Sequence, residues 1–195
     1  AFRSGGDGPE YIHYLPDEST AIDVAKAFNG LNGGNTASAL FELSSGHWVV
    51  GDTMSIQAAV DEASAGDIVD VRAGTFLEMV DVNKSMDLRG PNYGTAGNSG
   101  GRVAEAIVGP AVDNQDAAFL LNASDVSVRG FTMDGNNPAL PANGTGFGGA
   151  DQFMATGVYQ YFDAEGQTIQ DNIIRNVYYF GVFLFPLNAN ADWTG

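Results

Sequence analysis

Short apolar runs with a period of two, each ended by a glycine or a polar turn, constrain the fold of this chain most. Between Ile68 and Leu88 three such runs follow one another, and apolar residues alternate with polar ones within them. Alternation of this kind is typical of half-buried strands. The turns that separate the runs are Ala73-Gly74, Asn83-Lys84-Ser85 and Gly90-Pro91. The pattern predicts short strands that each turn after a few residues, as at the start of a stack of coils.

A short helix is expected immediately before these strands. Ser55 can cap its first turn, and an apolar stripe with helical spacing follows. The members of that stripe are Ile56, Ala59, Val60 and Ala63. Ala65-Gly66 is expected to end the helix. We expect this helix to cover the amino-terminal end of the stack.

The same region resembles a known family. The segments that carry the likeness are Ile56-Gln57-Ala58-Ala59-Val60, Gly66-Asp67-Ile68-Val69, Ala73-Gly74-Thr75-Phe76-x-Glu78, Asn83-Lys84-Ser85-Met86-x-Leu88-x-Gly90 and Asp125-Val126-x-Val128-x-Gly130-Phe131-Thr132. Over residues 53–188 the chain resembles the pectin-lyase-like right-handed parallel β-helix superfamily. The resemblance implies an all-β solenoid. It implies little about function, because that superfamily includes polysaccharide lyases, glycoside hydrolases, pectin methylesterases, epimerases, phage tailspikes and non-catalytic adhesin modules.

Two parts of the chain differ in regularity. Residues 1–52 are predicted to form a small α+β extension, with a helix from residue 19 or 20 to 28 and a strand at residues 11–15. Two further strands, at residues 39–43 and 47–50, are joined by Ser44-Ser45-Gly46. Residues 53–195 are predicted to form a parallel β-helix of about four coils, truncated or open at its carboxyl-terminal end.

Repeated landmarks support a stack of coils. Gly90, Gly130 and Asn172 each follow a short β-run at nearly equal separations along the chain. The extra length between them is expected in two loops rich in glycine, asparagine and proline, at residues 93–102 and 136–153. Asn172 and Asn176 are candidates for an asparagine ladder, in which a side-chain amide bonds the backbone of a neighbouring coil.

The end of the stack leaves three alternatives open. No amphipathic helix follows the apolar run at residues 178–185, so the last coil would expose unpaired backbone groups and a slice of core. The natural chain could be longer, the tail with Trp193 could fold over the end, or a second copy could stack there. Head-to-tail stacking of copies would generate a filament.

Charge and composition exclude several partners. The chain has 8 Lys and Arg against 24 Asp and Glu, a net charge of −16, and no cysteine. Such a surface repels nucleic acid and anionic membranes. The absence of cysteine excludes disulfides and thiolate metal sites. No apolar run reaches the ~18 residues needed to span a membrane, so no membrane insertion is expected.

Calcium is the one cofactor that the sequence favours. Two turns concentrate the hard oxygen ligands that Ca²⁺ takes in irregular sites. The candidate ligands are Asp113, Asn114, Asp116, Asp134 and Asn136. Aspartate and asparagine are also ordinary turn residues, so a solvated turn is the alternative interpretation.

No catalytic motif is predicted. His13 and His47 are the only histidines, and neither lies near a nucleophile motif. Glycoside hydrolysis needs two carboxylates about 5 to 9.5 Å apart. The candidate pairs, Asp134 with Asp151 and Asp163 with Asp171, carry no local signal of a raised pKa, so surface solvation is favoured. The glycine pattern at residues 144–149 matches a dinucleotide fingerprint by letters alone, without the flanking strand and helix that such a site requires.

Sugar binding is the more specific hypothesis. Tyr159 and Tyr161 lie two apart, on one face of a strand, where they would stack either on sugar rings or on each other in the core. Arg129 and Asp134 are the polar candidates for the same ligand. For Phe162, Phe183 and Phe185 we expect stacking inside the core.

Three functions are consistent with these observations. The favoured one is a secreted or cell-surface β-helix module for polysaccharide binding, adhesion or extracellular assembly, without catalysis. A fragment of a polysaccharide lyase or glycoside hydrolase is the first alternative. A structural filament subunit that stacks through open coil ends is the second.

Overall fold

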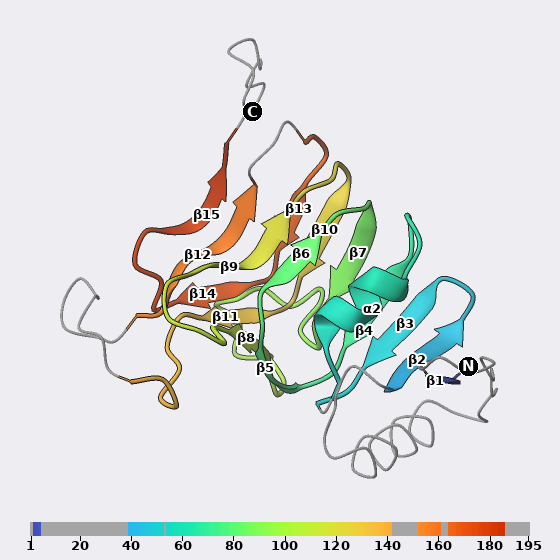
Figure 1. Cartoon of the computed structure of the whole chain (residues 1–195), viewed down its shortest axis with the longest axis horizontal. Coiled ribbons are helices and arrows are strands. Elements are labelled where there is room, and N and C mark those ends of the chain that lie inside the picture. The colour runs from blue at the N-terminus through green and yellow to red at the C-terminus, as the bar shows by residue number, and fades with distance from the viewer. Residues whose placement is uncertain (1, 5–38, 53, 142–151, 161–163, 186–195) are drawn as a thin grey trace.

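Three sheets and one helix make up the computed structural model, which describes residues 2–4, 39–52, 54–141, 152–160 and 164–185 (Figure 1). Sheet A contains, in spatial order, β1 (Phe2–Ser4), β2 (Ala39–Ser44), β3 (His47–Val50), β4 (Ile68–Val71), β7 (Met86–Arg89), β10 (Val126–Arg129) and β13 (Thr168–Gln170). Sheet B contains β5 (Gly74–Leu77), β8 (Ala106–Gly109), β11 (Thr132–Asp134) and β14 (Ile173–Arg175). Sheet C contains β6 (Val80–Val82), β9 (Gln115–Leu121), β12 (Met154–Gln160) and β15 (Phe180–Leu184).

From β4 onwards the chain visits sheets A, B and C in strict rotation. We name one pass through the three sheets a round. Each strand pairs in parallel with the corresponding strand of the next round, and β4 and β10 lie in the same sheet. Figure 1 shows the resulting order most clearly in sheet C, where β6, β9, β12 and β15 lie side by side. The predicted all-β architecture with stacked parallel strands is confirmed.

The parallel register places like residues above like residues. Val69, Leu88 and Val128 occupy equivalent positions in sheet A, and all three are fully buried. One position further along each strand, Asp70, Arg89 and Arg129 form an outward column. A slip of one residue would exchange these two columns, so the alternating sequence fixes the register.

The core is a single cluster enclosed by the three sheets. Aliphatic side chains dominate it, with Phe119 and Phe131 in contact at a ring-centroid distance of 5.1 Å. Phe119 comes from sheet C, whereas Phe131 lies between sheets A and B, so the pair connects different walls of the core.

The predicted helix is α2 (Ile56–Glu62). Ser55 is its N-cap, and the Ser55 hydroxyl accepts a 3.1 Å hydrogen bond from the backbone N–H of Ala58. Ile56, Ala59 and Val60 are buried, and Figure 1 shows α2 against β4 and β6. The helix ends at Glu62, before the expected stop at Ala65-Gly66, because Ala63 already takes an extended conformation.

An antiparallel hairpin precedes the first round. β2 and β3 pair as the sequence predicts, and Gly46 in their turn has a φ of 73°. β3 also pairs in parallel with β4, so the hairpin continues sheet A. The expected boundary between residues 52 and 53 stays a prediction. The strand at residues 11–15 and the helix ending at residue 28 lie outside the described residues.

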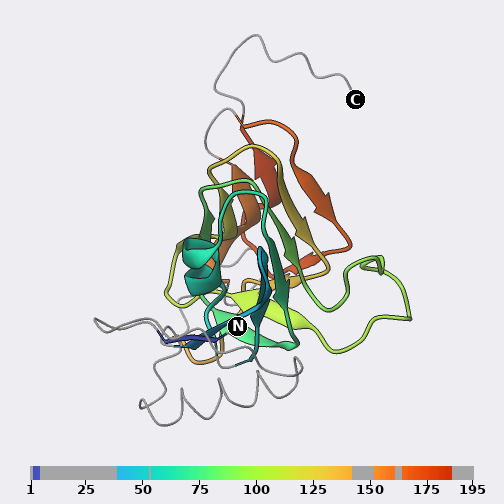
Figure 2. The same cartoon turned by 90° about the vertical axis from the view of Figure 1, so that its right-hand side faces the viewer.

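Long connections leave sheet A after β7 and sheet B after β11, as the sequence predicts for residues 93–102 and 136–153. Figure 2 shows the first of these connections projecting from the body of the molecule. Of the second, residues 142–151 lie outside the described part of the chain.

The landmark residues need one correction. Arg129 pairs with Gln170, so Asp171, not Asn172, is equivalent to Gly130. Gly130 and Asp171 both have a left-handed φ, of 80° and 59°. Asn172 does bond the neighbouring round, since its side chain accepts from Phe131 N–H at 2.9 Å and donates to Val128 C=O at 2.8 Å. The Asn176 side chain instead donates to the Asp134 carboxylate, so Asn172 bonds the backbone of the neighbouring round as predicted, whereas this Asn176 bond goes to a side chain.

Within the described residues, no helix has the length and apolar character needed to cross a membrane.

Candidate aromatic binding site

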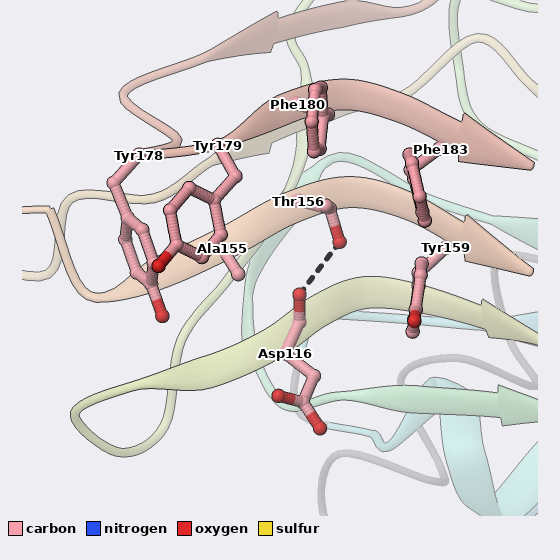
Figure 3. A pocket seen from close by; sticks show the side chains of 8 residues that line it. All are labelled: Asp116, Ala155, Thr156, Tyr159, Tyr178, Tyr179, Phe180 and Phe183. Carbon is pink, nitrogen blue, oxygen red and sulfur yellow. Dashed lines mark hydrogen bonds between the residues drawn. The ribbon is translucent and has the colours of Figure 1, made fainter. Parts of the chain in front are cut away.

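A hollow of about 240 Å³ lies on sheet C, between β9, β12 and β15 (Figure 3). We name it the aromatic hollow, because five of its lining side chains are tyrosine or phenylalanine. The lining residues are Asp116, Ala155, Thr156, Tyr159, Tyr178, Tyr179, Phe180 and Phe183. The hollow is therefore built by three successive rounds of the chain.

The pairing of β12 with β15 creates its aromatic wall. Tyr159 pairs with Phe183 across the two strands, and their ring centroids are 5.5 Å apart with the planes inclined by 21°. Phe180 lies 4.8 Å from Phe183 with an interplanar angle of 18°. Figure 3 shows the Phe183 and Tyr159 rings edge-on, one above the other, so that their faces border the space over Thr156.

Two tyrosines close the opposite side of the aromatic hollow. Tyr178 and Tyr179 precede β15, and their backbone N–H groups donate to the carbonyls of Met154 and Ala155 at 3.1 and 3.0 Å. Their rings meet edge to face, with centroids 4.7 Å apart. Tyr179 is 68% exposed and Phe180 51% exposed. Large aromatic side chains of this exposure are available to a ligand.

An acid completes the lining. The Thr156 hydroxyl donates a 2.7 Å hydrogen bond to the backbone carbonyl of Asp116, and the exposed Asp116 side chain lines the hollow (Figure 3). Burial raises the pKa of the Tyr178 phenol above its ordinary value, and coulombic repulsion from Tyr179, Asp116 and Asp113 raises it further. The Asp116 and Asp113 carboxylates add negative charge near the hollow, and no arginine, lysine or histidine is among its described lining residues.

Of the four residues grouped as a ligand site from the sequence, the structure describes three and separates them. Tyr159 lines the aromatic hollow on sheet C. Arg129 lies on sheet A, and Asp134 ends β11 on sheet B. Tyr161 lies outside the described residues. Of the three described residues, Tyr159 is therefore the one that belongs to the hollow.

Arg129 takes part in an ion-pair cluster. Its guanidinium donates to Asp87 at 2.6 Å, as does that of Arg89, and both guanidinium groups lie over the ring of Tyr93, at 4.4 and 4.9 Å from its centroid. The hydrogen bonds to Asp87 raise the pKa of Arg129, although burial opposes this effect. The Arg129 charge is therefore engaged within the protein.

Asp134 is also engaged. One carboxylate oxygen accepts from Arg175 Nε at 2.8 Å. The other accepts from the Asn176 side chain at 2.7 Å and from the Asn136 backbone N–H at 3.1 Å. These contacts join the ends of β11 and β14, so the Asp134 carboxylate has a structural role.

The candidate calcium ligands fall into two places. One group, between β8 and the start of β9, contains Asp113, Asn114 and Asp116. The other group lies at the end of β11 and just after it, and contains Asp134 and Asn136. In the part of the chain that the structure describes, no group of three or more His, Cys, Asp or Glu side chains could hold a metal ion. A Ca²⁺ site stays a prediction.

Phe185 is a correction. We expected it to stack in the core, but it is 47% exposed, and its ring lies 6.0 Å from that of Phe183 outside the core cluster. Phe183 likewise lines the aromatic hollow. Both belong to the last described round, in which β15 has a partner on one side only among the described strands. Phe162 lies outside the described residues.

Several pairings were not anticipated from the sequence. His47 Nε2 lies 2.6 Å from Asp70 Oδ2 across β3 and β4, and Trp48 Nε1 donates to Asp67 at 3.1 Å.

The role of Asp116 beside aromatic residues was also missed, because Asp116 and Tyr178 are far apart in the sequence. The run of aromatic residues from 178 to 180 was the available signal. Asp151, Asp163, His13 and the glycine pattern at 144–149 lie outside the described residues.

Comparisons of the chain with models of protein families, with curated proteins and with solved structures found no match.

Proposed function

We propose that this chain is a right-handed parallel β-helix module, secreted or at the cell surface, that binds polysaccharide through the aromatic hollow and has no catalytic chemistry of its own. The observation that carries the proposal is the aromatic wall of Tyr159, Phe180 and Phe183 beside a polar floor. Sugar rings stack on exposed aromatic faces, and hydroxyls and carboxylates at the edge bond the sugar hydroxyl groups.

The rotation of the chain through three parallel sheets supports the solenoid part of the proposal. Connections between parallel strands are right-handed in nearly all proteins, because a right-twisted strand packs back onto its sheet only in that way. The resemblance to the pectin-lyase-like superfamily is consistent with this handedness.

The size of the hollow favours one sugar ring of a longer chain. A volume of about 240 Å³ is smaller than the ~300 to ~1,000 Å³ that is usual for small-molecule sites. The exposed rings of Tyr179 and Phe185 lie beyond Phe180 and Phe183, where neighbouring sugar units of a polymer could contact them.

Calorimetric titration with a panel of neutral, acidic and amino polysaccharides tests the proposal. We expect at least one of them to bind, and Tyr159→Ala and Phe183→Ala each to weaken that binding about tenfold, the loss of one stacking contact. Tyr93→Ala is the matched control, since Tyr93 is 44% exposed but lies by Arg129 on sheet A. The absence of binding to every glycan, or equal losses in all three variants, would refute a sugar site in the hollow.

The same panel tests the catalytic alternative. A lyase or glycoside hydrolase would release unsaturated products or reducing ends, and the proposal expects neither. If turnover appears and is abolished by Arg129→Ala or Asp134→Ala, the module is an enzyme and the proposal is wrong on that point.

Self-assembly is a second candidate, favoured by the exposed apolar side chains of the last described round. Phe180, Val182 and Phe185 are 51%, 42% and 47% exposed. Copies that stack there would increase the mass measured by light scattering with concentration, and Phe185→Asp would abolish the increase. A constant monomer mass for the unchanged protein would eliminate this candidate.

A further inference from the structure

We infer that the aromatic hollow selects polysaccharides whose sugar rings carry a protonated amino group, such as polymers of glucosamine. This inference rests on the proposed function and specifies its ligand. It concerns the charge of the ligand, whereas the proposed function concerns only its sugar character.

The lining of the hollow supplies the first argument. Among its described lining residues, the one charged side chain is the carboxylate of Asp116, and the other polar side chains are the hydroxyls of Thr156 and the tyrosines. The aromatic rings add their own negative faces, which attract a cation within about 6 Å of the ring centroid. An ammonium group on a sugar that lies in the hollow against Tyr159 would meet both kinds of attraction.

The raised pKa of Tyr178 points in the same direction. Burial is the main cause, but the negative charges of Asp116 and Asp113 contribute to it, so both acids act on the space at this end of the hollow. A site that disfavours one more negative charge on a phenol also disfavours a uronate carboxylate. Burial disfavours charge of either sign, so only the coulombic part of the shift, from Asp116 and Asp113, favours a positive charge.

Five of the described cations bond other groups of the protein. Arg89 and Arg129 bond Asp87, and Arg175 bonds Asp134. Arg102 bonds Glu105, and the Lys84 ammonium donates to the carbonyls of Asp61 and Ala63. A uronate polymer would therefore find no uncommitted partner among these five groups. The net charge of −16 also attracts cationic and repels anionic polymers at long range.

The aromatic wall favours a sugar over a lysine-rich peptide. The Tyr159 and Phe183 rings lie one above the other with their planes inclined by 21°, and Phe180 stacks on Phe183, so three aromatic rings border the hollow (Figure 3). A pyranose ring can contact more than one of these rings at once, whereas a lysine ammonium needs the face of one ring.

Titration with oligosaccharides of equal length tests the inference. The probes are a glucosamine hexamer, its fully N-acetylated form and an oligogalacturonide. We expect the glucosamine hexamer to bind at least about tenfold more tightly than the acetylated form, and the preference to shrink as salt rises from 0.05 to 0.5 M, because screening weakens the attraction of exposed charges. The oligogalacturonide should bind most weakly.

A charge variant makes the test local. Asp116→Asn should weaken binding of the amino form much more than binding of the acetylated form, and so remove most of the preference for the amino sugar. Asp61→Asn changes the net charge equally, but on α2, where Asp61 accepts from Gln57, so it should keep the preference. If both variants lose the preference for the amino sugar to the same extent, the preference comes from the overall charge of the protein, and the inference is overturned.

Other outcomes separate the two proposals. If the acetylated or uronate oligomer binds as well as the amino form, and Tyr159→Ala abolishes that binding, the inference fails and the proposed function stands. If polylysine of equal charge binds as tightly as the glucosamine hexamer and competes with it, the hollow recognises a cationic peptide and the inference fails. If no oligosaccharide binds, both fail.

Discussion

Glu78 accepts a 2.8 Å hydrogen bond from the backbone N–H of Ile56, the first residue of α2. Its carboxylate also accepts from the Gln57 N–H at 3.0 Å and from the Ser55 hydroxyl at 2.8 Å. The first N–H groups of a helix have no partner within the helix and carry partial positive charge. A carboxylate from the turn after β5 therefore fastens α2 to the first round.

The loss of this carboxylate should destabilise the protein. We expect Glu78→Ala to lower the free energy of unfolding by about 2 kcal/mol, since hydrogen bonds to charged groups contribute ~1.5 to ~3 kcal/mol. Urea denaturation followed by circular dichroism measures it. The exposed Glu165 provides the control, and Glu165→Ala should change the same free energy by less than ~0.5 kcal/mol. Similar values for the two variants would contradict the proposed role of Glu78.

Gly130 should not tolerate a side chain. Its φ is 80°, and a β-carbon there would overlap the backbone nitrogen of Tyr93. Gly130→Ala combines backbone strain with a clash against main-chain atoms, so we expect it to cost at least ~1 kcal/mol. Gly100→Ala is the control, because no atom lies within 4 Å of its β-carbon position. Thermal melts of the two variants should differ, and equal melting temperatures would mean that the Gly90–Tyr93 turn can move away.

Glu105 should make stability depend on pH. Its hydrogen bond to Arg102 lowers the pKa of Glu105 below the ordinary 4.5, although burial opposes the shift. A lowered pKa in the folded state stabilises the protein above the unfolded value, and this contribution is lost as pH falls from about 4.5 through the folded value. Glu105→Gln should therefore be less stable than the unchanged protein at pH 7, with the difference shrinking below pH 4.5. A difference that is constant with pH, measured by urea titrations, would contradict this assignment.

Tyr178 should ionise later than an ordinary tyrosine. Burial, followed by the charges of Tyr179, Asp116 and Asp113, raises its pKa above 10.0. Because the pKa of Tyr178 is higher in the folded than in the unfolded state, its contribution to the free energy of unfolding is present below pH 10.0 and is lost as pH rises through the folded value. Titration followed by ultraviolet absorbance should show one tyrosine that ionises at a higher pH than an ordinary tyrosine, and Tyr178→Phe should remove that transition.

Asp116→Asn provides the companion measurement. It should move the Tyr178 transition toward the ordinary tyrosine value without restoring it completely, because burial remains the larger cause of the shift. Asp61→Asn should leave the transition in place. If Asp116→Asn has no effect on Tyr178, the carboxylate does not act on the aromatic hollow, and the electrostatic argument for an amino sugar weakens with it.

The local sequence predicted much of the fold because a parallel stack repeats local patterns. Val69, Leu88 and Val128 alternate with polar neighbours, and each alternation is legible without knowledge of the others. Ser55 marked the start of α2 through its own side chain, and Ser45-Gly46 marked the β2–β3 turn. Such features depend on residues within a few positions of one another.

The candidate site depends on which strands lie side by side, and the sequence alone does not give that pairing. Asp116, Tyr159 and Phe183 meet because β9, β12 and β15 are adjacent, and connections of different length separate those strands along the chain. Local periodicity gives the face of a side chain but not its partner in the next round. The sequence by itself thus determined short alternating strands, the helix cap and the excess of negative charge. Only the tertiary structure decided that Asp134 and Arg129 bond within the protein while Asp116 lines an aromatic hollow, because parallel pairing brings together residues from separate rounds.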